Sequence, residues 1–123
     1  MRRLVALIAT GTLALSIAGV AGAQGTFFNT SLTINFSRSG NDSFFGRVKS
    51  PKPRCIRQRK VSVYRKRSGT DQKIGSDLSS STGRWRINVG GSAHRGDYYA
   101  KTKALTIPAG VCKGARSVTT HVS

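Results

Sequence analysis

The sequence predicts an all-β protein, a single β-sandwich of about seven strands with one disulfide. Two observations predict the strands. After residue 24 no stretch repeats apolar residues at helical spacing, and short alternating runs rich in Val, Ile, Thr, Phe, Tyr and Trp lie between Gly, Ser, Pro and Asn. A barrel is the alternative architecture. The third observation is a pair of distant cysteines, Cys55 and Cys112, whose separation excludes a CxxC redox or zinc pair.

Residues 1–23 have the three-part pattern of a secretory signal peptide. Arg2 and Arg3 precede an uncharged apolar run at 4–20, and small residues of the kind that a signal peptidase accepts follow at 21–23. The run is near the lower length limit for a membrane span and is diluted by Thr, Ser and Gly. We therefore expect contact with a membrane only through this leader, which is cleaved, and a protein that is secreted or associated with the cell envelope.

Export decides how the cysteines and the chain length are interpreted. In an oxidising compartment an isolated cysteine pair in a small domain is most simply one disulfide. Closing a loop of this size stabilises the fold by about 4 kcal/mol in the chain-entropy model. Removing 23 of the 123 residues leaves 100, enough for one domain. We expect a flexible N-terminal arm at 24–31 and the sandwich at 32–123.

The first half of the domain contains three predicted strands, at 32–36, 44–49 and 60–65. Each alternates apolar and polar residues, so that one face turns toward the core. Pro51 and Pro53 end the second strand. The expected inward residues are Leu32, Ile34, Phe36, Phe44, Gly46, Val48, Val61 and Val63.

The second half contains four more predicted strands. They are a weak edge strand at 73–78, a strong strand at 84–89, the longest strand at 98–105 and a closing strand at 117–122. The expected inward residues are Trp85, Ile87, Val89, Val118 and Val122. Trp85 could stack on a ligand, but its alternation with two aliphatic residues predicts a place in the core. Gly83, in the turn before it, is expected to have a positive φ.

Four segments in a fixed order, FFGRVKSPKPRC, RKVSVYRKRSG, IGSDLSSSTGRWRI and GDYYAK, are followed by a late cysteine. This order resembles small secreted bacterial domains with a transthyretin-like or carboxypeptidase-regulatory-like fold, over residues 44–122. Ser79 and Ser80 stand where the family pattern usually has Thr and Asp before the Gly-x-Trp turn. The resemblance implies a β-sandwich, pairing of Cys55 with Cys112, and a non-catalytic accessory or adhesive role.

Positive charge is the main functional clue. Of 21 basic residues two lie in the leader, which leaves 19 against four aspartates, a net charge of +15 for residues 24–123. Such a field attracts polyanions by steering and counterion release. The alternative is a solvated basic surface that only keeps the protein soluble. The expected polyanion-binding residues are Arg47, Lys49, Lys52, Arg54, Arg57, Arg59, Lys60, Arg65, Lys66, Arg67, Arg84, Arg86, Lys101 and Lys103.

These features predict a monomeric, non-catalytic module that adheres electrostatically to an anionic cell-envelope polymer or glycan. The alternative is a cationic secreted effector that acts on membranes or nucleic acid. Phe45, Tyr64 and Tyr99 are expected to face outward beside basic residues, an arrangement that favours binding of single-stranded nucleic acid. Cross-strand packing would also explain Phe45 and Tyr99. No specific nucleic-acid site is expected.

No catalytic residue, cofactor or metal site is predicted. The chain has no Glu, and its four Asp are scattered, so paired carboxylates for acid–base chemistry are missing. Ser92, His94 and Asp97 could be drawn as a hydrolase triad, but six residues rarely allow the geometry. Two histidines without a cluster do not make a metal site. The Arg-Gly-Asp tripeptide at 95–97 matches an integrin-type motif, but chance in a chain rich in Arg and Gly and an ordinary turn role of Gly96 and Asp97 explain it better.

Overall fold

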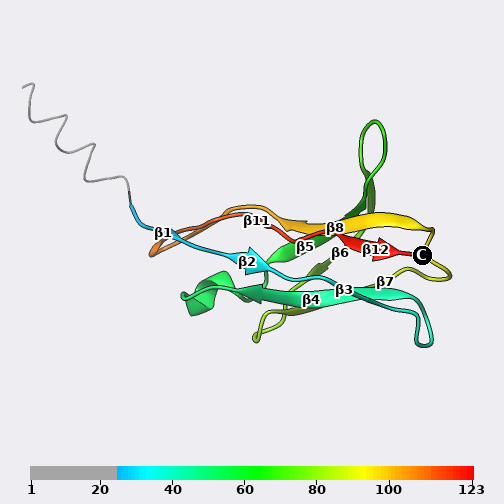
Figure 1. Cartoon of the computed structure of the whole chain (residues 1–123). Helices are drawn as coiled ribbons and strands as arrows, with labels where there is room; N and C mark the ends of the chain where they lie inside the picture. The colour runs from blue at the N-terminus through cyan, green and yellow to red at the C-terminus, as the bar shows by residue number, and fades with distance from the viewer. Residues whose placement is uncertain (1–24) are drawn as a thin grey trace, which may run out of the picture.

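The computed structural model of the chain describes residues 25–123, so the predicted signal peptide at 1–23 lies outside the described residues. Within them the protein is nearly all β, and two open sheets pack face to face. Figure 1 shows the two layers, one with β3, β4 and β7 and the other with β5, β8 and β12. The predicted all-β sandwich is confirmed.

The first sheet is built around β4 (Ser43–Lys49). On one side β4 pairs with β7 (Arg84–Asn88), and on the other with β2 (Ser31–Leu32) and then β3 (Asn35–Ser37) in one continuous register. The strand predicted at 32–36 is therefore present, but divided. At the division Arg47 N donates to Thr33 Oγ1 at 2.9 Å instead of to a backbone carbonyl.

Gly46 is required at this division. A Cβ on residue 46 would collide with the carbonyl group of Thr33 and touch the Trp85 ring. Gly83 is another position where only glycine fits, since its φ is +86° and a Cβ there would collide with the carbonyl oxygen of Val48. The positive φ expected for Gly83 is confirmed, and Val48 N donates to Gly83 O at 2.8 Å.

The second sheet has the order β11-β8-β5-β6, with β12 also paired to β8. Its strands are β5 (Lys60–Arg65), β6 (Gln72–Leu78), β8 (Gly96–Thr102), β11 (Ala115–Arg116) and β12 (Thr120–Val122). The weak strand β6 lies at the edge, as predicted. Figure 1 shows the loop between β5 and β6 projecting from the molecule.

Two strand predictions in this sheet are wrong. The strand expected at 98–105 ends at Thr102, and the one expected at 117–122 is interrupted. Val118 is 77% exposed whereas Val122 is 1% exposed, so they do not share a face. The interruption follows from Ser117, whose hydroxyl oxygen accepts from Ala100 N at 2.8 Å in place of a backbone carbonyl.

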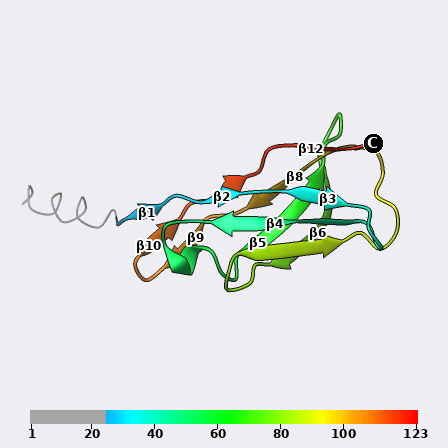
Figure 2. The same cartoon turned by 60° about the horizontal axis from the view of Figure 1, so that its bottom comes forward.

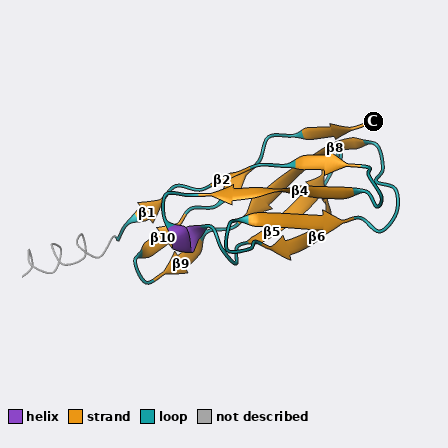
Figure 3. Ribbon diagram, turned by 90° about the horizontal axis from the view of Figure 1, so that it is seen from below, coloured by secondary structure: helices purple, strands orange, loops and turns teal. Residues whose placement is uncertain are grey.

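A third, small sheet lies at one end of the molecule (Figures 2 and 3). It consists of β1 (Phe27–Phe28), β10 (Gly110–Cys112) and β9 (Leu105–Ile107), beside a 3₁₀ turn, η2 (Pro53–Cys55). Strand β1 runs parallel to β10, so the segment expected as a flexible arm instead carries paired strands, including the start of β2. The sequence did not indicate this because β1 is only two residues long.

The predicted disulfide joins Cys55 to Cys112, with Cα atoms 5.4 Å apart across 57 residues of sequence. Both cysteines are buried with Ile107, and Phe28 packs against them. The disulfide thus ties η2 to the small sheet and encloses a second, minor core. Such a bond is typical of proteins in oxidising compartments.

The main core fills the space between the two large sheets. Trp85 is 3% exposed and packs among residues of both layers, so the predicted core role is confirmed. Its Nε1 is buried without a hydrogen-bond partner. Val89 and Phe36, predicted inward, are only partly buried at the margin of this core. The buried members are Leu32, Ile34, Phe44, Val48, Val61, Val63, Trp85, Ile87, Ala93, Tyr98, Ala100 and Val122.

Candidate polyanion-binding surfaces

Strand alternation sorts the basic residues of the two large sheets onto their outer surfaces. Because inward residues of β4, β5, β7 and β8 build the core, the residues between them face solvent. We call the outer surface of β4 and β7 the arginine face; its basic residues are Arg47, Lys49, Arg84 and Arg86. We call the outer surface of β5, β6 and β8 the lysine face; its basic residues are Lys60, Lys73, Lys101 and Lys103.

The arginine face places two like charges directly opposite each other. Arg47 of β4 pairs with Arg84 of β7 in the antiparallel ladder, both side chains are exposed, and neither has a hydrogen-bonded or ionic side-chain partner among the described residues. Cβ atoms of such a pair are about 4.5–5.5 Å apart, and like charges there are destabilising. The arrangement therefore favours an anion that neutralises both guanidinium groups.

A groove of about 670 Å³ runs over this face. Arg47, Lys49 and Arg84 line it, and Asp77 is the one acidic residue in its wall. The Asp77 carboxylate already accepts from Arg86 N at 2.9 Å. The groove therefore keeps an excess of positive charge.

Arg86 is held more firmly than its neighbours on this face. Its Nη1 donates to Ser43 Oγ at 2.6 Å, and its guanidinium lies 4.9 Å from the centre of the Phe45 ring. These contacts orient the side chain beside the Arg47–Arg84 pair while leaving donors free, since a guanidinium has five N–H groups. On the arginine face, Arg86 is thus fixed by contacts within the described residues, whereas the side chains of Arg47 and Arg84 are not.

The lysine face carries a groove of about 270 Å³. Three of its lysines come from β5, β6 and β8, and Lys103 directly follows β8. Ser62 and Tyr64 complete its floor, and no acidic residue lines it. Ser62 of β5 lies directly opposite Lys101 of β8. A site with several ammonium groups and no carboxylate suits an extended anion better than a single small one.

The sequence did not indicate that Lys73 belongs to the lysine face or that Arg116 of β11 lies beside it. The pairing of edge strand β6 with β5 contains a register shift, so the alternation of residues does not show which side of the sheet Lys73 lies on. Arg116 lies just before the interruption at Ser117 and places its guanidinium 3.8 Å from the centre of the Tyr99 ring. Lys73 could have been found only from its pairing with Tyr64.

Aromatic rings near the basic residues are already covered by the protein's own side chains. Tyr64 stacks on Tyr99 with ring centres 5.5 Å apart, and Arg116 covers the other side of the pair. Tyr99, expected to be an outward ring, is only 6% exposed. Phe45 is covered in the same way by Arg86. These rings present little open surface on which a nucleobase could stack.

The Tyr99 hydroxyl is also engaged. It donates to Asp71 Oδ2 at 2.6 Å, and Arg67 N donates to Asp71 Oδ1 at 3.1 Å. These two hydrogen bonds lower the pKa of Asp71, and the bond to Asp71 raises the pKa of Tyr99. The contacts fix the base of the β5–β6 loop against the lysine face.

Arg59 is the clearest correction to the expected surface, because its side chain is buried. The guanidinium donates to the carbonyl oxygens of Cys55 at 2.7 Å, Lys103 at 2.9 Å and Lys113 at 3.0 Å, and to Thr30 Oγ1 at 3.3 Å. Loss of hydration on burial lowers its pKa. Arg59 therefore joins four chain segments around the disulfide and, although it lies in the wall of the lysine-face groove, it is only 2% exposed.

The other expected residues divide into exposed and engaged ones. Lys52 is half-buried over the Phe28 ring, and half-buried Arg65 donates to the carbonyl oxygen of Arg95 at 2.7 Å. Four expected residues are exposed but line neither groove; they are Arg54, Arg57, Lys66 and Arg67. Seven of the fourteen therefore belong to the two faces: Arg47, Lys49, Lys60, Arg84, Arg86, Lys101 and Lys103.

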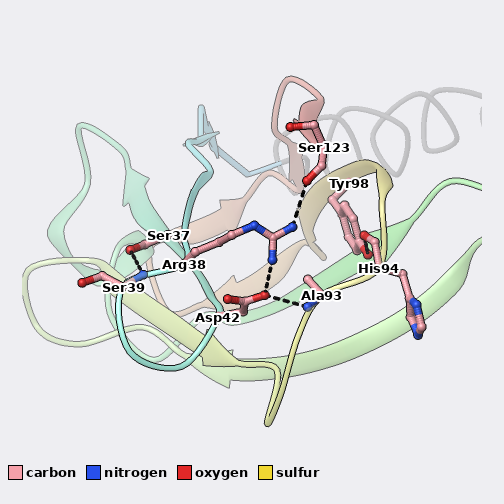
Figure 4. A network of polar contacts seen from close by, with 8 residues as sticks. All are labelled: Ser37, Arg38, Ser39, Asp42, Ala93, His94, Tyr98 and Ser123. Carbon is pink, nitrogen blue, oxygen red and sulfur yellow. Dashed lines mark hydrogen bonds and ion pairs between the residues drawn. The ribbon is translucent and has the colours of Figure 1, made fainter.

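Ion pairs engage few of the basic groups. Among the described residues Arg38 pairs with Asp42 at 2.6 Å, and His121 contacts Asp97 at 2.7 Å. Figure 4 shows the first of these pairs in a network in which Asp42 also accepts from Ala93 N and Arg38 reaches the carbonyl oxygen of Ser123. Both pairs lie away from the two grooves.

The residues of the hypothetical triad are not joined. Asp97 contacts His121 and not His94, whose carbonyl oxygen accepts from Tyr98. In Figure 4 the His94 imidazole points away from the Asp42 network. Gly96 and Asp97 of the Arg-Gly-Asp tripeptide lie in β8 and pair with β12. Residues 25–123 contain no group of three His, Cys, Asp or Glu that could hold a metal.

No helix in the described part of the chain is long and apolar enough to cross a membrane. Comparison with family models, curated proteins and solved structures finds no match to this chain.

Proposed function

We propose that the protein is an exported, non-catalytic module that binds linear anionic polymers or glycans of the cell envelope through its two basic faces. The chemistry recognised is a row of carboxylate, sulfate or phosphate groups on a sugar or polyol backbone. The observation that carries the proposal is the Arg47–Arg84 pair, two exposed arginines without an anionic partner in residues 25–123 that lie directly opposite each other in the ladder and line one groove. Guanidinium groups bind carboxylate and phosphate in a bidentate manner.

Two further observations support this class of partner over nucleic acid or a membrane. The rings beside the basic residues are covered by Arg86 and Arg116, so stacking of bases gains little. The exposed large apolar residues come from four separate chain segments, with Phe27 and Leu105 in the same small sheet; they are Phe27, Leu78, Leu105 and Val118. Charge on a regular polymer is therefore the favoured recognition element.

Export is supported by the Cys55–Cys112 disulfide and by the signal-peptide pattern of residues 1–23. The resemblance of residues 44–122 to secreted transthyretin-like modules supports an accessory, non-catalytic role. A basic surface that serves only solubility is the competing explanation. It predicts that removing any two exposed charges weakens polymer retention by the same amount.

Chromatography of the purified protein on resins that carry dextran sulfate, polygalacturonate or polyphosphate tests the proposal, with uncharged dextran as the blank. We expect retention on the charged resins that weakens steeply with NaCl. The R47Q/R84Q variant should show a log K against log[salt] slope smaller by about one to two, since each polyanion contact contributes roughly 0.7–0.9. The matched control is R95Q/K113Q, which removes two exposed charges that line neither groove.

Equal slopes for the two variants would show that net charge alone governs retention, and retention independent of salt would exclude an electrostatic partner. Anionic vesicles and single-stranded DNA serve as competitors. Preferred binding of DNA, or leakage of vesicle contents, would replace the proposal with the cationic effector.

A further inference from the structure

The two basic faces lie on opposite sides of the molecule. Arg47 and Arg84 project from the sheet of β4 and β7, whereas Lys60 and Lys101 project from the sheet of β5 and β8. The inward neighbours of all four residues pack against one another in the shared core. The faces therefore point away from each other, separated by two sheets about 10 Å apart and by the side chains on both outer surfaces.

We infer that the protein is a bivalent cross-linker, which holds one anionic polymer chain on the arginine face and a second on the lysine face. The inference rests on the proposed function and goes beyond it, because a protein with one basic face would coat a polymer without joining chains. Each face has its own groove, and no residue lines both.

The β6–β7 edge lies between the two grooves on one side of the sandwich, where Lys60, Ser76, Asp77 and Leu78 line a separate hollow. Leu78 of β6 is 60% exposed there, and the Asp77 carboxylate lies beside it, bonded to Arg86 N. A polymer chain that turned around this edge would pass an apolar side chain and a negative charge. Two separate chains, one on each face, avoid both.

The faces differ in chemistry as well as direction. The arginine face presents planar guanidinium groups, and the lysine face presents compact ammonium groups that place no demand on the geometry of the anion. Carboxylate or phosphate polymers therefore fit the arginine face, while any dense polyanion fits the lysine face. A cross-linker with unlike faces can join two different polymers.

Mixing beads of two colours, both coated with polygalacturonate, tests the inference with the purified protein. We expect wild-type protein at low salt to produce mixed-colour aggregates, with a maximum at intermediate protein concentration and dispersal at excess protein or 1 M NaCl. Three variants each lower the net charge by four: R47E/R84E on the arginine face, K60E/K101E on the lysine face and R95E/K113E as the control.

Either single-face variant should keep measurable binding to one bead but lose aggregation at least tenfold, whereas the control should aggregate beads as the wild type does. Circular dichroism and size-exclusion chromatography of each variant establish that it is folded and monomeric. Wild-type protein that binds without joining beads would overturn the inference and leave the proposed function intact. Aggregation by both single-face variants would overturn it also, because the two faces would then be dispensable. No binding by wild type would remove both proposals.

Discussion

Arg59 places a guanidinium in the interior with carbonyl and hydroxyl oxygens as its only hydrogen-bond acceptors among the described residues. Burial of a charge is costly unless its donors are satisfied. Here the donors serve the carbonyl oxygens of three separate segments near the disulfide, so the charge fixes the end of the fold where the small sheet lies. The residue is structural although its neighbours in sequence are exposed.

Replacing Arg59 with methionine should therefore lower the free energy of unfolding by about 3 kcal/mol, since several buried carbonyl groups lose a charged donor at once. Arg59→Lys should recover part of the lost stability, because an ammonium keeps the charge and three donors but lacks the planar arrangement of donors that lets a guanidinium reach several carbonyl groups at once. Arg57→Met, at an exposed position two residues away, should change stability by less than about 0.5 kcal/mol. Urea unfolding measures all three. If Arg59→Met is as stable as wild type but binds polymer more weakly, Arg59 contributes to binding and not to the stability of the fold.

The burial of Arg59 was open to prediction from its neighbours. Residues 59, 61 and 63 share one side of an extended chain, and Val61 and Val63 are both buried. Composition argued the other way, because an arginine is rarely buried without a carboxylate. The acceptors come from residues 30, 55, 103 and 113, which only the folded chain brings together.

At the level of strands, hydroxyl side chains decide where the predicted elements break. Thr33 and Ser117 each replace a backbone acceptor with a side-chain oxygen, and a strand is interrupted at both positions. Such local competition is typical of Ser and Thr. The alternation of apolar residues predicted which strands exist and which way they face, but it does not reveal which of many hydroxyls will enter a ladder.

At the base of the β5–β6 loop, the hydrogen bond from Tyr99 to Asp71 makes stability depend on pH. Because two hydrogen bonds lower the folded pKa of Asp71, its contribution to stability is present above the unfolded pKa of about 4 and is lost as pH falls through the lower folded value. Tyr99→Phe removes the larger cause, so the pKa of Asp71 should rise toward that of an ordinary Asp. NMR titration of the Asp71 carboxyl carbon measures this shift.

Tyr64→Phe is the matched control, since it alters the same aromatic stack but leaves the Tyr99–Asp71 hydrogen bond in place. The pKa of Asp71 should be unchanged in that variant. An Asp71 that titrates identically in Tyr99→Phe and wild type would mean that the hydrogen bond is absent in solution.

For the molecule as a whole, the sequence predicted the two layers, the disulfide and the excess of positive charge. The division of that charge into two opposed faces depends on register. Arg47 meets Arg84 only because β4 and β7 pair as they do, and those strands are 35 or more residues apart in the chain. Pairing between distant strands cannot be read from local alternation.

The same charges should give stability and binding opposite responses to salt. With 19 basic and four acidic residues in 24–123, screening relieves self-repulsion, while few ion pairs are present to be weakened. We expect the free energy of unfolding to rise by on the order of 1 kcal/mol between 20 and 500 mM NaCl, as polymer binding falls. At low salt R47Q/R84Q should be more stable than wild type by about 0.5 kcal/mol, because the cross-strand repulsion is gone. Urea unfolding at both salt concentrations tests this. A variant less stable than wild type at low salt would mean that the two arginines stabilise the fold and do not repel each other in the absence of a ligand.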